Sequence, residues 1–460
     1  MNLILLTIDC LRADHLGCLG YSKKITPNLD YLAGSGVLFS QAISAASWTL
    51  PSFTCLFSSS YPSMHGEQPG IANSRVTIAQ VLQRYGYRTA AFHSNPFLSS
   101  FFGFGKGFDT FDDSMHKNSY ESLLRKPREL LKSIVGTKAR WLSKFLAYLY
   151  GLVVTPSPKA EKLNNKAARW LRDNRNDFFL WMHYMDAHEP YWQCKGILSP
   201  FRVCQIHNFN LNRKAEKNKY KGSEQGSLSP KEINRLIKLY DENISHVDKM
   251  IGSFLRMLDR NNMLSETIVI VTADHGQQFM EHGYYGHRYF LYEELIRVPL
   301  IIAGPMLESQ VINQQVTLLD LAPTVLDLLG IDKPSSFSGT SLLPLMRGNS
   351  TSSKGTDVIS VTSVNDIAIQ KRRWLNANDK QMSIRTGKWK YIYVEGKQDE
   401  LYCLEGDPKE LQNLIDVEPQ IASELRTKIM NHIEVEHATI PSKEEIIKEK
   451  VRWLKSSGKI

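Results

Sequence analysis

The sequence is poor in cysteine, which excludes a fold held together by a disulfide framework. Six cysteines occur among 460 residues, and no C-x-x-C pair is present. Cys194 and Cys204, with His207 nearby, leave open a bridge or a zinc site, against the alternative of two buried or free thiols in an inserted segment. The fold must instead depend on a hydrophobic core, for which a chain of this length with 42% hydrophobic residues is sufficient.

Long hydrophobic runs are also missing. The longest apolar stretch, Trp141–Val154, is interrupted by Lys144 and is too short to span a bilayer. Met1 leads directly into the strand-like run Asn2–Ile8, without the basic segment and small-residue cleavage site of a signal peptide. We therefore expect a cytoplasmic protein.

Acidic residues are scarce in one segment, and this segment nearly accounts for the net charge of +9. Between Lys117 and Lys166 there are eleven Lys/Arg residues against three Glu. Such a segment favours phosphate groups, anionic lipid headgroups or nucleic acid, or it is simply a solvated helical face. No zinc-finger spacing, RNP-like aromatic motif or heptad accompanies it, so nucleic-acid binding is not expected. Peripheral contact of residues 117–166 with a membrane surface stays open.

What the sequence does contain is an alternation of short β-branched runs with amphipathic helical patterns. This alternation predicts the α/β class, with a mostly parallel sheet and helices on both of its faces. The expected strands are Leu3–Ile8, Arg88–Phe92, Phe178–His183, Thr267–Thr272 and Val298–Ile302. The expected helices are Thr26–Gly34, Val76–Tyr85, Lys231–Leu258 and Leu318–Leu329.

Two domains are predicted, a catalytic domain over residues 1–355 and a small C-terminal α+β subdomain over residues 356–460. Within the first, residues 114–163 are expected to form a basic helical insertion and the polar stretch 194–229 a loop. In the second, Ser383–Thr386 and Trp389–Val394 have the pattern of hairpin strands, and a charged helix ends the chain.

Polar side chains follow two of the expected strands. Asp9 comes directly after the first strand, and Asp274 and His275 come at the end of Thr267–Thr272. A single aspartate there could merely cap the next helix, but the carboxyl ends of parallel strands meet at one sheet edge, where ligands bind. Together the three residues indicate a metal site.

A hydroxyl group is expected near the same edge. Thr49 stands at the N-cap position of a helical run that ends near Ser60, with Pro51 in its first turn. The positive end of a helix dipole favours an alkoxide and an anionic ester. The alternative is that Thr49 is only a helix cap.

Several histidines lie in loops that follow these strands. His183 and His188 belong to one such segment, and His282 and His287 to a glycine-punctuated loop after Asp274. One isolated histidine is usually structural, but this number at one sheet edge indicates a functional site.

Taken together, these motifs resemble those of the sulfatase family of the alkaline phosphatase superfamily, in a variant with Thr in place of the formylglycine-forming Cys. The resemblance covers nearly the whole chain in family order. The matching segments are Ile8–Gly17, Pro51-Ser52, Tyr61–Gly66, Asp186–Tyr191, Thr272–Gly276, Arg297–Leu300, Asp320–Thr324, Arg385–Tyr391, Glu400–Tyr402 and Asp407-Pro408. It implies an alkaline-phosphatase-like sheet.

The resemblance also implies roles for individual residues. One divalent metal ion would be held by Asp9, Asp274 and His275, with Thr49 as nucleophile completing the shell. His188 and His287 match positions that contact the substrate anion or protonate the leaving group. The positions assigned to substrate binding are Arg12, His93 and Asn95.

Two departures from the family bear on the chemistry. Thr49-x-Pro51-x-Phe53 replaces the C-x-P-x-R motif, so formylglycine cannot form by the usual route. A phosphorylated threonine is hydrolysed more readily than a sulfated one. Cys10 replaces a second Asp common in calcium sulfatases, which leaves calcium, magnesium, manganese and zinc open. A second metal would need residues such as Asp186, His188 and His287, whose spacing resembles one-metal members more closely.

The function expected is therefore a metal-dependent hydrolase of sulfate or phosphate esters, with phosphoesters or phosphodiesters favoured. The substrate would be a small molecule or a glycan or lipid ester. Two alternatives are a transferase of phospho-headgroups acting at a membrane surface, and a non-catalytic binder of sulfated or phosphorylated glycans.

Overall fold

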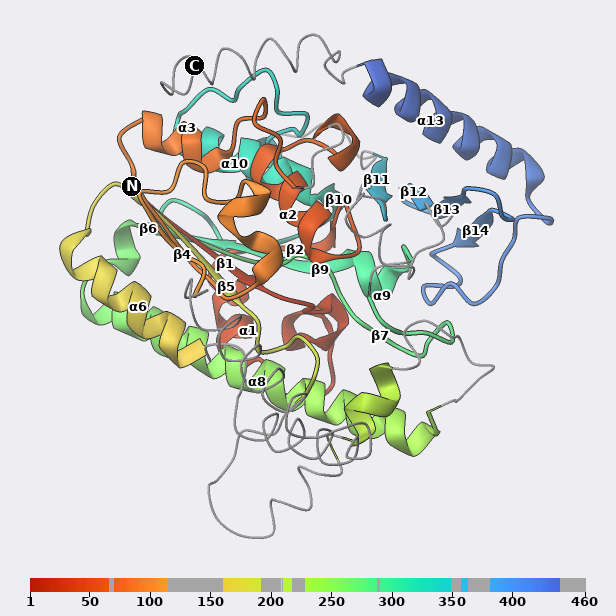
Figure 1. Cartoon of the computed structure of the whole chain (residues 1–460), viewed down its shortest axis with the longest axis horizontal. Coiled ribbons are helices and arrows are strands. Elements are labelled where there is room, and N and C mark those ends of the chain that lie inside the picture. The colour runs from red at the N-terminus through yellow and green to blue at the C-terminus, as the bar shows by residue number, and fades with distance from the viewer. Residues whose placement is uncertain are drawn as a thin grey trace, which may run out of the picture.

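A mixed eight-stranded sheet forms the centre of the molecule (Figure 1). The computed structural model describes residues 1–65, 70–114, 160–191, 208, 210–216, 228–287, 290–348, 357–362 and 381–438. The strand order is β10-β2-β9-β6-β1-β5-β3-β4. The strands are β1 (Asn2–Ile8), β2 (Val37–Ile43), β3 (Arg88–Phe92), β4 (Thr110–Asp112), β5 (Phe178–Tyr184), β6 (Thr267–Ala273), β9 (Arg297–Ala303) and β10 (Gln310–Thr317).

The three central strands, β1, β5 and β6, are buried along their whole length. Their near-continuous apolar sequences follow from this position, because helices cover both faces of the sheet. Strand β1 runs parallel to both neighbours, and Ile8 pairs with Tyr184 on one side and with Ala273 on the other. The carboxyl ends of the three strands therefore coincide.

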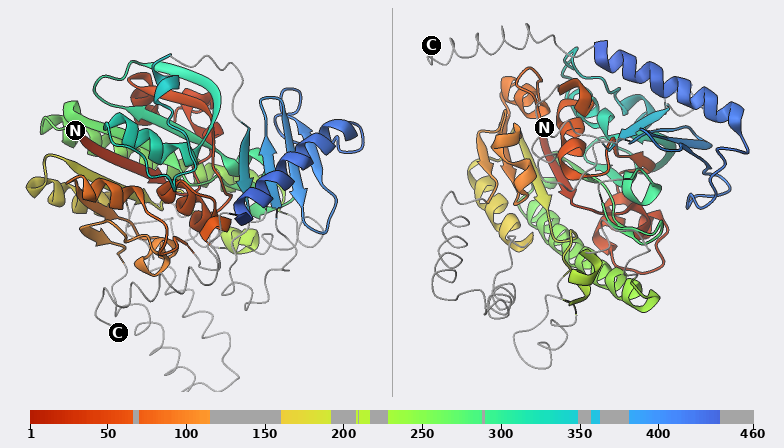
Figure 2. Two further views of the ribbon diagram at one scale, coloured as in Figure 1. Left: turned by 90° about the horizontal axis from the view of Figure 1, so that it is seen from above. Right: turned by 45° about the vertical axis from the view of Figure 1, so that its right-hand side comes forward.

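Helices pack on both faces of this sheet (Figures 1 and 2). One face carries α1 (Pro27–Gly34), α6 (Ala160–Asp173) and α8 (Pro230–Arg260), and the other carries α2 (Thr49–Ser58), α3 (Ile78–Arg84) and α10 (Leu321–Leu328). The long helix α8 begins at a capping box, in which Ser229 and Glu232 each accept a bond from the other's backbone N–H. Its apolar stripe is buried against the sheet layer.

A second, antiparallel sheet lies beside the first (Figure 2). Its strands, in spatial order, are β11 (Val358–Val361), β12 (Gln381–Arg385), β13 (Trp389–Val394) and β14 (Glu400–Cys403), and α13 (Pro419–Ala438) packs on β12 and β13. Between the two sheets, the buried Lys390 pairs with Glu410 at 2.7 Å and with Glu293 at 3.2 Å. Glu293 begins the short helix α9 (Glu293–Ile296), so buried charges join the second sheet to the segment after β8 (Tyr285–Gly286).

The α/β class and the mostly parallel sheet flanked by helices are confirmed. Strands β2 and β10 were not anticipated, and β9 is antiparallel to both β2 and β6. The loop expected over 194–229 is wrong in part, because residues 210–216 are helical. Outside the described residues lie most of the predicted 114–163 insertion, the segment Trp141–Val154, Cys194, Cys204, His207 and the 355/356 boundary. Among the described residues, no helix is both long enough and apolar enough to cross a membrane.

Asp320 is expected to make the free energy of unfolding depend on pH. Asp320 accepts bonds from the backbone N–H of Thr340 at 2.8 Å and Thr317 at 3.4 Å, and burial raises its pKa to about 6. Since a free Asp has a pKa of about 3.9, the folded state holds this proton more tightly. The resulting stabilisation is complete below about pH 3.9 and is lost as the pH rises through about 6.

We therefore expect Asp320→Asn to weaken the pH dependence of stability. The amide keeps an acceptor oxygen for Thr340 but has no proton to lose, so the unfolding temperature of the variant should fall less than that of the wild type between about pH 4 and about pH 8. Thermal unfolding at several pH values measures this. Parallel curves for the two proteins would contradict it.

Candidate active site

The carboxyl ends of the central strands bring four buried polar residues together. Asp9 follows β1, His183 lies near the end of β5, and Asp274 and His275 follow β6; all four are fully buried. The coincident strand ends explain this meeting, because Ile8 pairs with both Tyr184 and Ala273. The predicted convergence of Asp9, Asp274 and His275 is observed.

Asp9 is held as an ionised carboxylate. Its Oδ2 accepts a bond from Asn95 Nδ2 at 2.9 Å and lies 3.1 Å from His183 Nε2. Burial alone would raise the pKa of this carboxyl, but His188, His183 and His275 outweigh that effect and hold the pKa well below its usual range. The carboxylate therefore keeps its negative charge although it is fully buried.

The pKa of Asp274 is shifted in the opposite direction to that of Asp9. Its Oδ1 accepts bonds from the backbone N–H of Cys10 at 3.2 Å and of His275 at 3.0 Å. Its buried Oδ2 has no hydrogen-bond donor among the described residues. Burial, and then the charge of Asp9, raise the pKa of Asp274.

His275 presents a lone pair to the same point. Its Nδ1 lies 2.9 Å from the carbonyl of Gly276 and donates to it, so that Nε2 is the atom that carries the lone pair when the ring is neutral. Nε2 lies 3.3 Å from Asp274 Oδ2 and 3.9 Å from Asp9 Oδ1. Asp9 Oδ1, Asp274 Oδ2 and His275 Nε2 thus face one another at one buried point. A divalent cation would satisfy these three acceptor atoms, which otherwise repel one another.

Thr49 is the first residue of α2 and contacts this group. Its Oγ1 lies 3.3 Å from His275 Nε2, and the residue is only 3% exposed. The N-cap is Trp48, which is extended and makes no side-chain cap. The placement of Thr49 at the N-cap is therefore wrong by one residue, and its hydroxyl is directed at the metal-site residues rather than at the helix backbone.

Cys10, His188 and His287 lie on one side of these residues. Cys10 adopts a positive φ of 60° and its Sγ donates to Asp9 Oδ1 at 3.0 Å. The same Sγ is 3.6 Å from His287 Nδ1, and the His287 ring lies 4.5 Å from His275 and 5.2 Å from His188 between centroids. Burial, and then Asp9 and Asp274, raise the pKa of the Cys10 thiol well above its usual range. The two predicted substrate-contacting histidines thus lie side by side.

The residues predicted to bind substrate have other partners in the structure. Arg12 pairs with Asp14 at 2.8 Å and with Glu281, and donates to the carbonyl of Gln277 at 3.0 Å. His93 packs against Trp181, and burial lowers its pKa to about 3, so its ring is neutral. Asn95, as noted, bonds to Asp9. Substrate contact by Arg12, His93 and Asn95 stays a prediction.

One site residue, Gln277, was not singled out from the sequence, and His183 was named among the histidines at this edge without a role of its own. His183 Nδ1 lies 3.0 Å from Thr7 Oγ1, which also accepts from Trp181 Nε1 at 3.0 Å, so this network orients the ring that contacts Asp9. Gln277 Oε1 lies 3.1 Å from His287 Nδ1. The signal for His183 was its place at the end of a strand adjacent to β1. His282, by contrast, stacks on Tyr292 and bonds to Glu294, away from Asp9.

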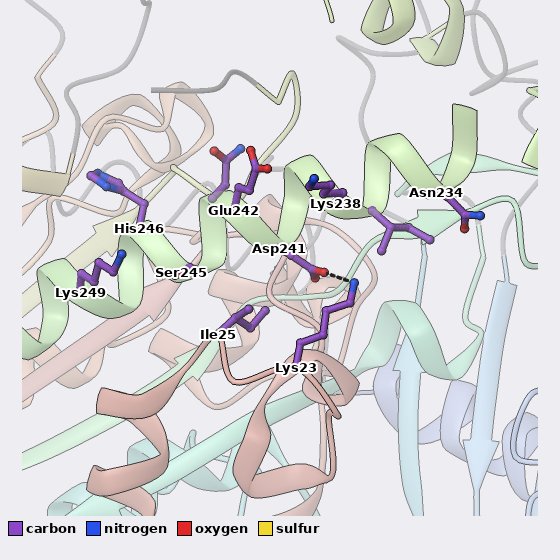
Figure 3. Close-up of a pocket in the computed structure, with 11 residues that line it drawn as sticks. Lys23, Ile25, Asn234, Lys238, Asp241, Glu242, Ser245, His246 and Lys249 are labelled. Carbon is purple, nitrogen blue, oxygen red and sulfur yellow. Dashed lines mark hydrogen bonds and ion pairs between the residues drawn. The ribbon is translucent and has the colours of Figure 1, made fainter. Parts of the chain in front are cut away.

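A separate cavity of about 700 Å³ lies between α8 and the loop that contains Lys23 and Ile25 (Figure 3). Its lining mixes Lys23, Lys238 and Lys249 with Asp241 and Glu242, and Lys23 pairs with Asp241 at 2.7 Å. None of the acceptor atoms described above belongs to its lining residues. The convergence of Thr49, Asp9, Asp274 and His275, not this cavity, is therefore the candidate active site.

The family model described as Sulfatase matches residues 1–331, which include every residue of this site. The chain belongs to the sulfatase family. A second model, described as N-sulphoglucosamine sulphohydrolase, C-terminal, matches residues 280–437 and so covers the second sheet and α13.

Curated sulfatases match the chain over different lengths. Arylsulfatase K of Rattus norvegicus is 34% identical over 221 residues, and the match covers 45% of this chain and only 37% of that relative's length. An Arylsulfatase of Clostridium perfringens (strain 13 / Type A) is 25% identical over 452 residues, covering 91% of this chain and 90% of the relative.

Solved structures share the sulfatase fold along nearly the whole chain. The phosphonate monoester hydrolase of Agrobacterium radiobacter superposes with a TM-score of 0.72 at 18% identity, covering 95% of this chain and 96% of the other. The protein BT4656, solved with its substrate D-glucosamine-2-N,6-O-disulfate, gives 0.68 at 19% identity and covers 96% and 99% of the two chains. These likenesses establish the fold.

Proposed function

We propose that this chain is a metal-dependent hydrolase of phosphate and sulfate esters in which Thr49 is the nucleophile and phosphoesters are the better substrates. The observation that carries the proposal is the position of Thr49 Oγ1, 3.3 Å from His275 Nε2 at the point where Asp9 and Asp274 converge. Membership of the sulfatase family supports ester hydrolysis.

The residues present fit a divalent cation. Asp9 Oδ1, Asp274 Oδ2 and His275 Nε2 would hold it, and Thr49 Oγ1 would complete the shell. A bound cation would lower the pKa of the Thr49 hydroxyl and polarise the ester. Asn95 and His183 fix the other oxygen of Asp9, and two backbone N–H groups fix the other oxygen of Asp274, so both carboxylates are oriented before a ligand enters.

The reaction proposed has two steps. The Thr49 hydroxyl loses its proton to solvent, its oxygen forms a bond to phosphorus, and the bond from phosphorus to the leaving oxygen breaks while that oxygen takes a proton from His188 or His287. Water then attacks the phosphorus of phosphothreonine and gives one proton to the histidine, the bond from phosphorus to the Thr49 oxygen breaks, inorganic phosphate is released, and the Thr49 oxygen regains a proton from solvent. The α2 N-terminus adds positive potential beside the transferred anion.

The environment of the motif favours phosphate over sulfate. Where sulfatases have the Arg of C-x-P-x-R, this chain has Phe53, which is fully buried and packs on Trp181 and Phe104. The motif that directs formylglycine formation is therefore absent from this helix. Formylglycine, as a hydrated aldehyde, lets a sulfated enzyme expel sulfate by elimination. Without it, a sulfated threonine must be hydrolysed by attack at sulfur, whereas a phosphothreonine is open to in-line attack by water at phosphorus.

A sulfate ester is the second candidate substrate. It is favoured by the likeness to the Clostridium perfringens protein named Arylsulfatase, which extends over 91% of this chain. The substrate bound to BT4656 is a sulfated glucosamine, and a glycan ester is therefore a substrate class to test beside small aryl esters. The transferase alternative depends on the basic segment, of which residues 117–159 lie outside the described part of the chain. The non-catalytic alternative has no comparable support either.

The decisive experiment compares esters that share one leaving group. We expect kcat/KM for p-nitrophenyl phosphate, or for the bis-p-nitrophenyl diester, to exceed that for p-nitrophenyl sulfate by at least ~10-fold, because only the phosphorylated Thr49 is readily hydrolysed. Because the leaving group is the same in these esters, a difference in kcat/KM does not arise from its departure. Faster turnover of the sulfate would contradict the preference, and no turnover of any ester by metal-loaded protein would contradict the function.

A further inference from the structure

The side chains of Cys10, His188 and His287 form a second group of potential metal ligands. Their ligand atoms all lie within 4.8 Å of one another; Cys10 also lies in a group with Asp9 and His275, beside the group of Asp9, His183 and Asp274. We propose that these three residues hold a second, sulfur-bound cation of the zinc class beside the cation of the Thr49 site. With the second ion bound, His188 and His287 would be its ligands and not proton donors to the leaving oxygen, so the proposal replaces that role; it depends on no choice of ester.

The spacing of these side chains matches one tetrahedral ion. Bond lengths of roughly 2.3 Å to sulfur and 2.0–2.1 Å to nitrogen place two tetrahedral ligands about 3.5 Å apart. Cys10 Sγ and His287 Nδ1 are 3.6 Å apart. A hydrogen bond to a thiol has a similar length, so the spacing supports a cation only together with the other ligands.

The third ligand is already oriented for coordination. His188 Nδ1 donates to the backbone carbonyl of Glu189, which leaves Nε2 with its lone pair, as is usual for a metal-bound histidine. Gln277 is oriented as well: its Nε2 donates to Glu189 Oε2 at 3.0 Å, and its Oε1 is directed to within 3.1 Å of His287 Nδ1. That amide positions the His287 ring, and the three ligands leave the fourth tetrahedral position open.

The two proposed cation sites are adjacent and meet at Asp9 and Cys10. Asp9 Oδ1 lies between them, 3.0 Å from Cys10 Sγ and 3.9 Å from His275 Nε2, and its negative charge would separate the two positive ions. Asp186, considered from the sequence as a ligand of a second metal, faces elsewhere: its Oδ1 lies 3.4 Å from Ala160 N and 3.8 Å from His246 Nε2. Cys10 takes the place that the sequence suggested for Asp186.

The donor set selects the kind of ion. A thiolate and two imidazoles prefer zinc and similar transition metals, whereas calcium and magnesium prefer a shell made of oxygen. Cys10 is buried while His188 and His287 are partly exposed, so the open side of the ion faces outward. A catalytic zinc keeps such an open position for water or substrate, and here it would attract the anionic ester.

Cobalt(II) tests the proposal because a thiolate ligand gives it a charge-transfer band in the near ultraviolet. The metal-stripped full chain is titrated with Co²⁺, and bound cobalt is measured together with the spectrum. We expect the wild type to bind two ions and show the band, and Cys10→Ser to bind one ion without it. Cys18→Ser, a matched control in a partly buried cysteine near Asp30, should behave like the wild type.

Asp274→Asn distinguishes this proposal from the proposed function. That variant should lose the ion of the Thr49 site and keep one cobalt with its sulfur band. A wild type that binds a single ion overturns the second site, whether or not the band is present, because Cys10 would then share the ion of Asp9. Persistence of the band in Cys10→Ser, or its loss in Asp274→Asn, overturns it equally.

Discussion

Replacement of Thr49 by alanine is expected to lower ester hydrolysis by ~10⁴-fold or more, the loss typical of removing a nucleophile. The fold should survive, because the Thr49 side chain does not cap α2 and its Oγ1 contact is with His275. Thr49→Ser keeps an oxygen at the same position and should retain activity within about 10-fold of the wild type. Initial rates with p-nitrophenyl phosphate measure both.

Thr54→Ala is the matched control for this experiment. Thr54 is a buried threonine of the same helix, but its Oγ1 donates to the carbonyl of Leu50 at 2.8 Å. It should cost stability and leave kcat nearly unchanged. Rapid acid quenching should also trap a phosphoryl group on the wild-type peptide that contains Thr49. Turnover by Thr49→Ala near the wild-type rate, or a label on another residue, would reject Thr49 as the nucleophile.

The position of the site could be predicted because it depends on strand direction. Asp9 and Asp274 follow apolar runs long enough to identify as buried strands, and parallel strands bring their carboxyl ends to one edge. His183 was named among the histidines of this edge but given no role of its own, because it lies in the last residues of such a strand, where an inward polar side chain depends on register. The pairing of Thr7 with His183 decides that register, and it is a tertiary contact.

The missed strands have a different physical cause. Strand β10 contains the polar run Asn313–Gln315 and lies at the edge of the sheet, half exposed, so its sequence lacks an apolar run. Strand β2 is apolar only at its two ends, and its pairing with β10 shifts register in the middle. The antiparallel direction of β9 follows from the path of the chain after β6, which no local pattern encodes.

Cys10 shows the limit of inference from a motif. By residue type it replaces a carboxylate ligand, which predicts only a weaker site for calcium. Its positive φ of 60°, uncommon for a residue other than glycine, turns the thiol toward both Asp9 and His287. That backbone conformation is fixed by the surrounding structure, where Cys10 N donates to Asp274 and Tyr240 donates to the Cys10 carbonyl.

Replacement of Asp274 by asparagine is expected to abolish hydrolysis and, at the same time, to stabilise the metal-free protein. The amide oxygen can still accept from Cys10 and His275, while its N–H₂ group would donate to His275 Nε2, 3.3 Å from the present Oδ2. One of two buried, mutually repelling carboxylates is thereby removed. The variant also loses the negative charge that a divalent cation requires.

The measurement is the unfolding temperature with and without added divalent cation. For the wild type, a cation at 100 times its Kd for the Thr49 site should add about 2.7 kcal/mol of stability. Asp274→Asn should lose this contribution and keep only the shift that comes from a cation at Cys10, His188 and His287. Asp248→Asn is the control, because Asp248 is a buried carboxylate that accepts bonds from Asn28 and Leu29 in the first turn of α1. This variant should unfold at a lower temperature and keep the full cation-dependent shift. An undiminished shift in Asp274→Asn would show that the converging acceptors at the carboxyl ends of β1 and β6 do not hold the ion.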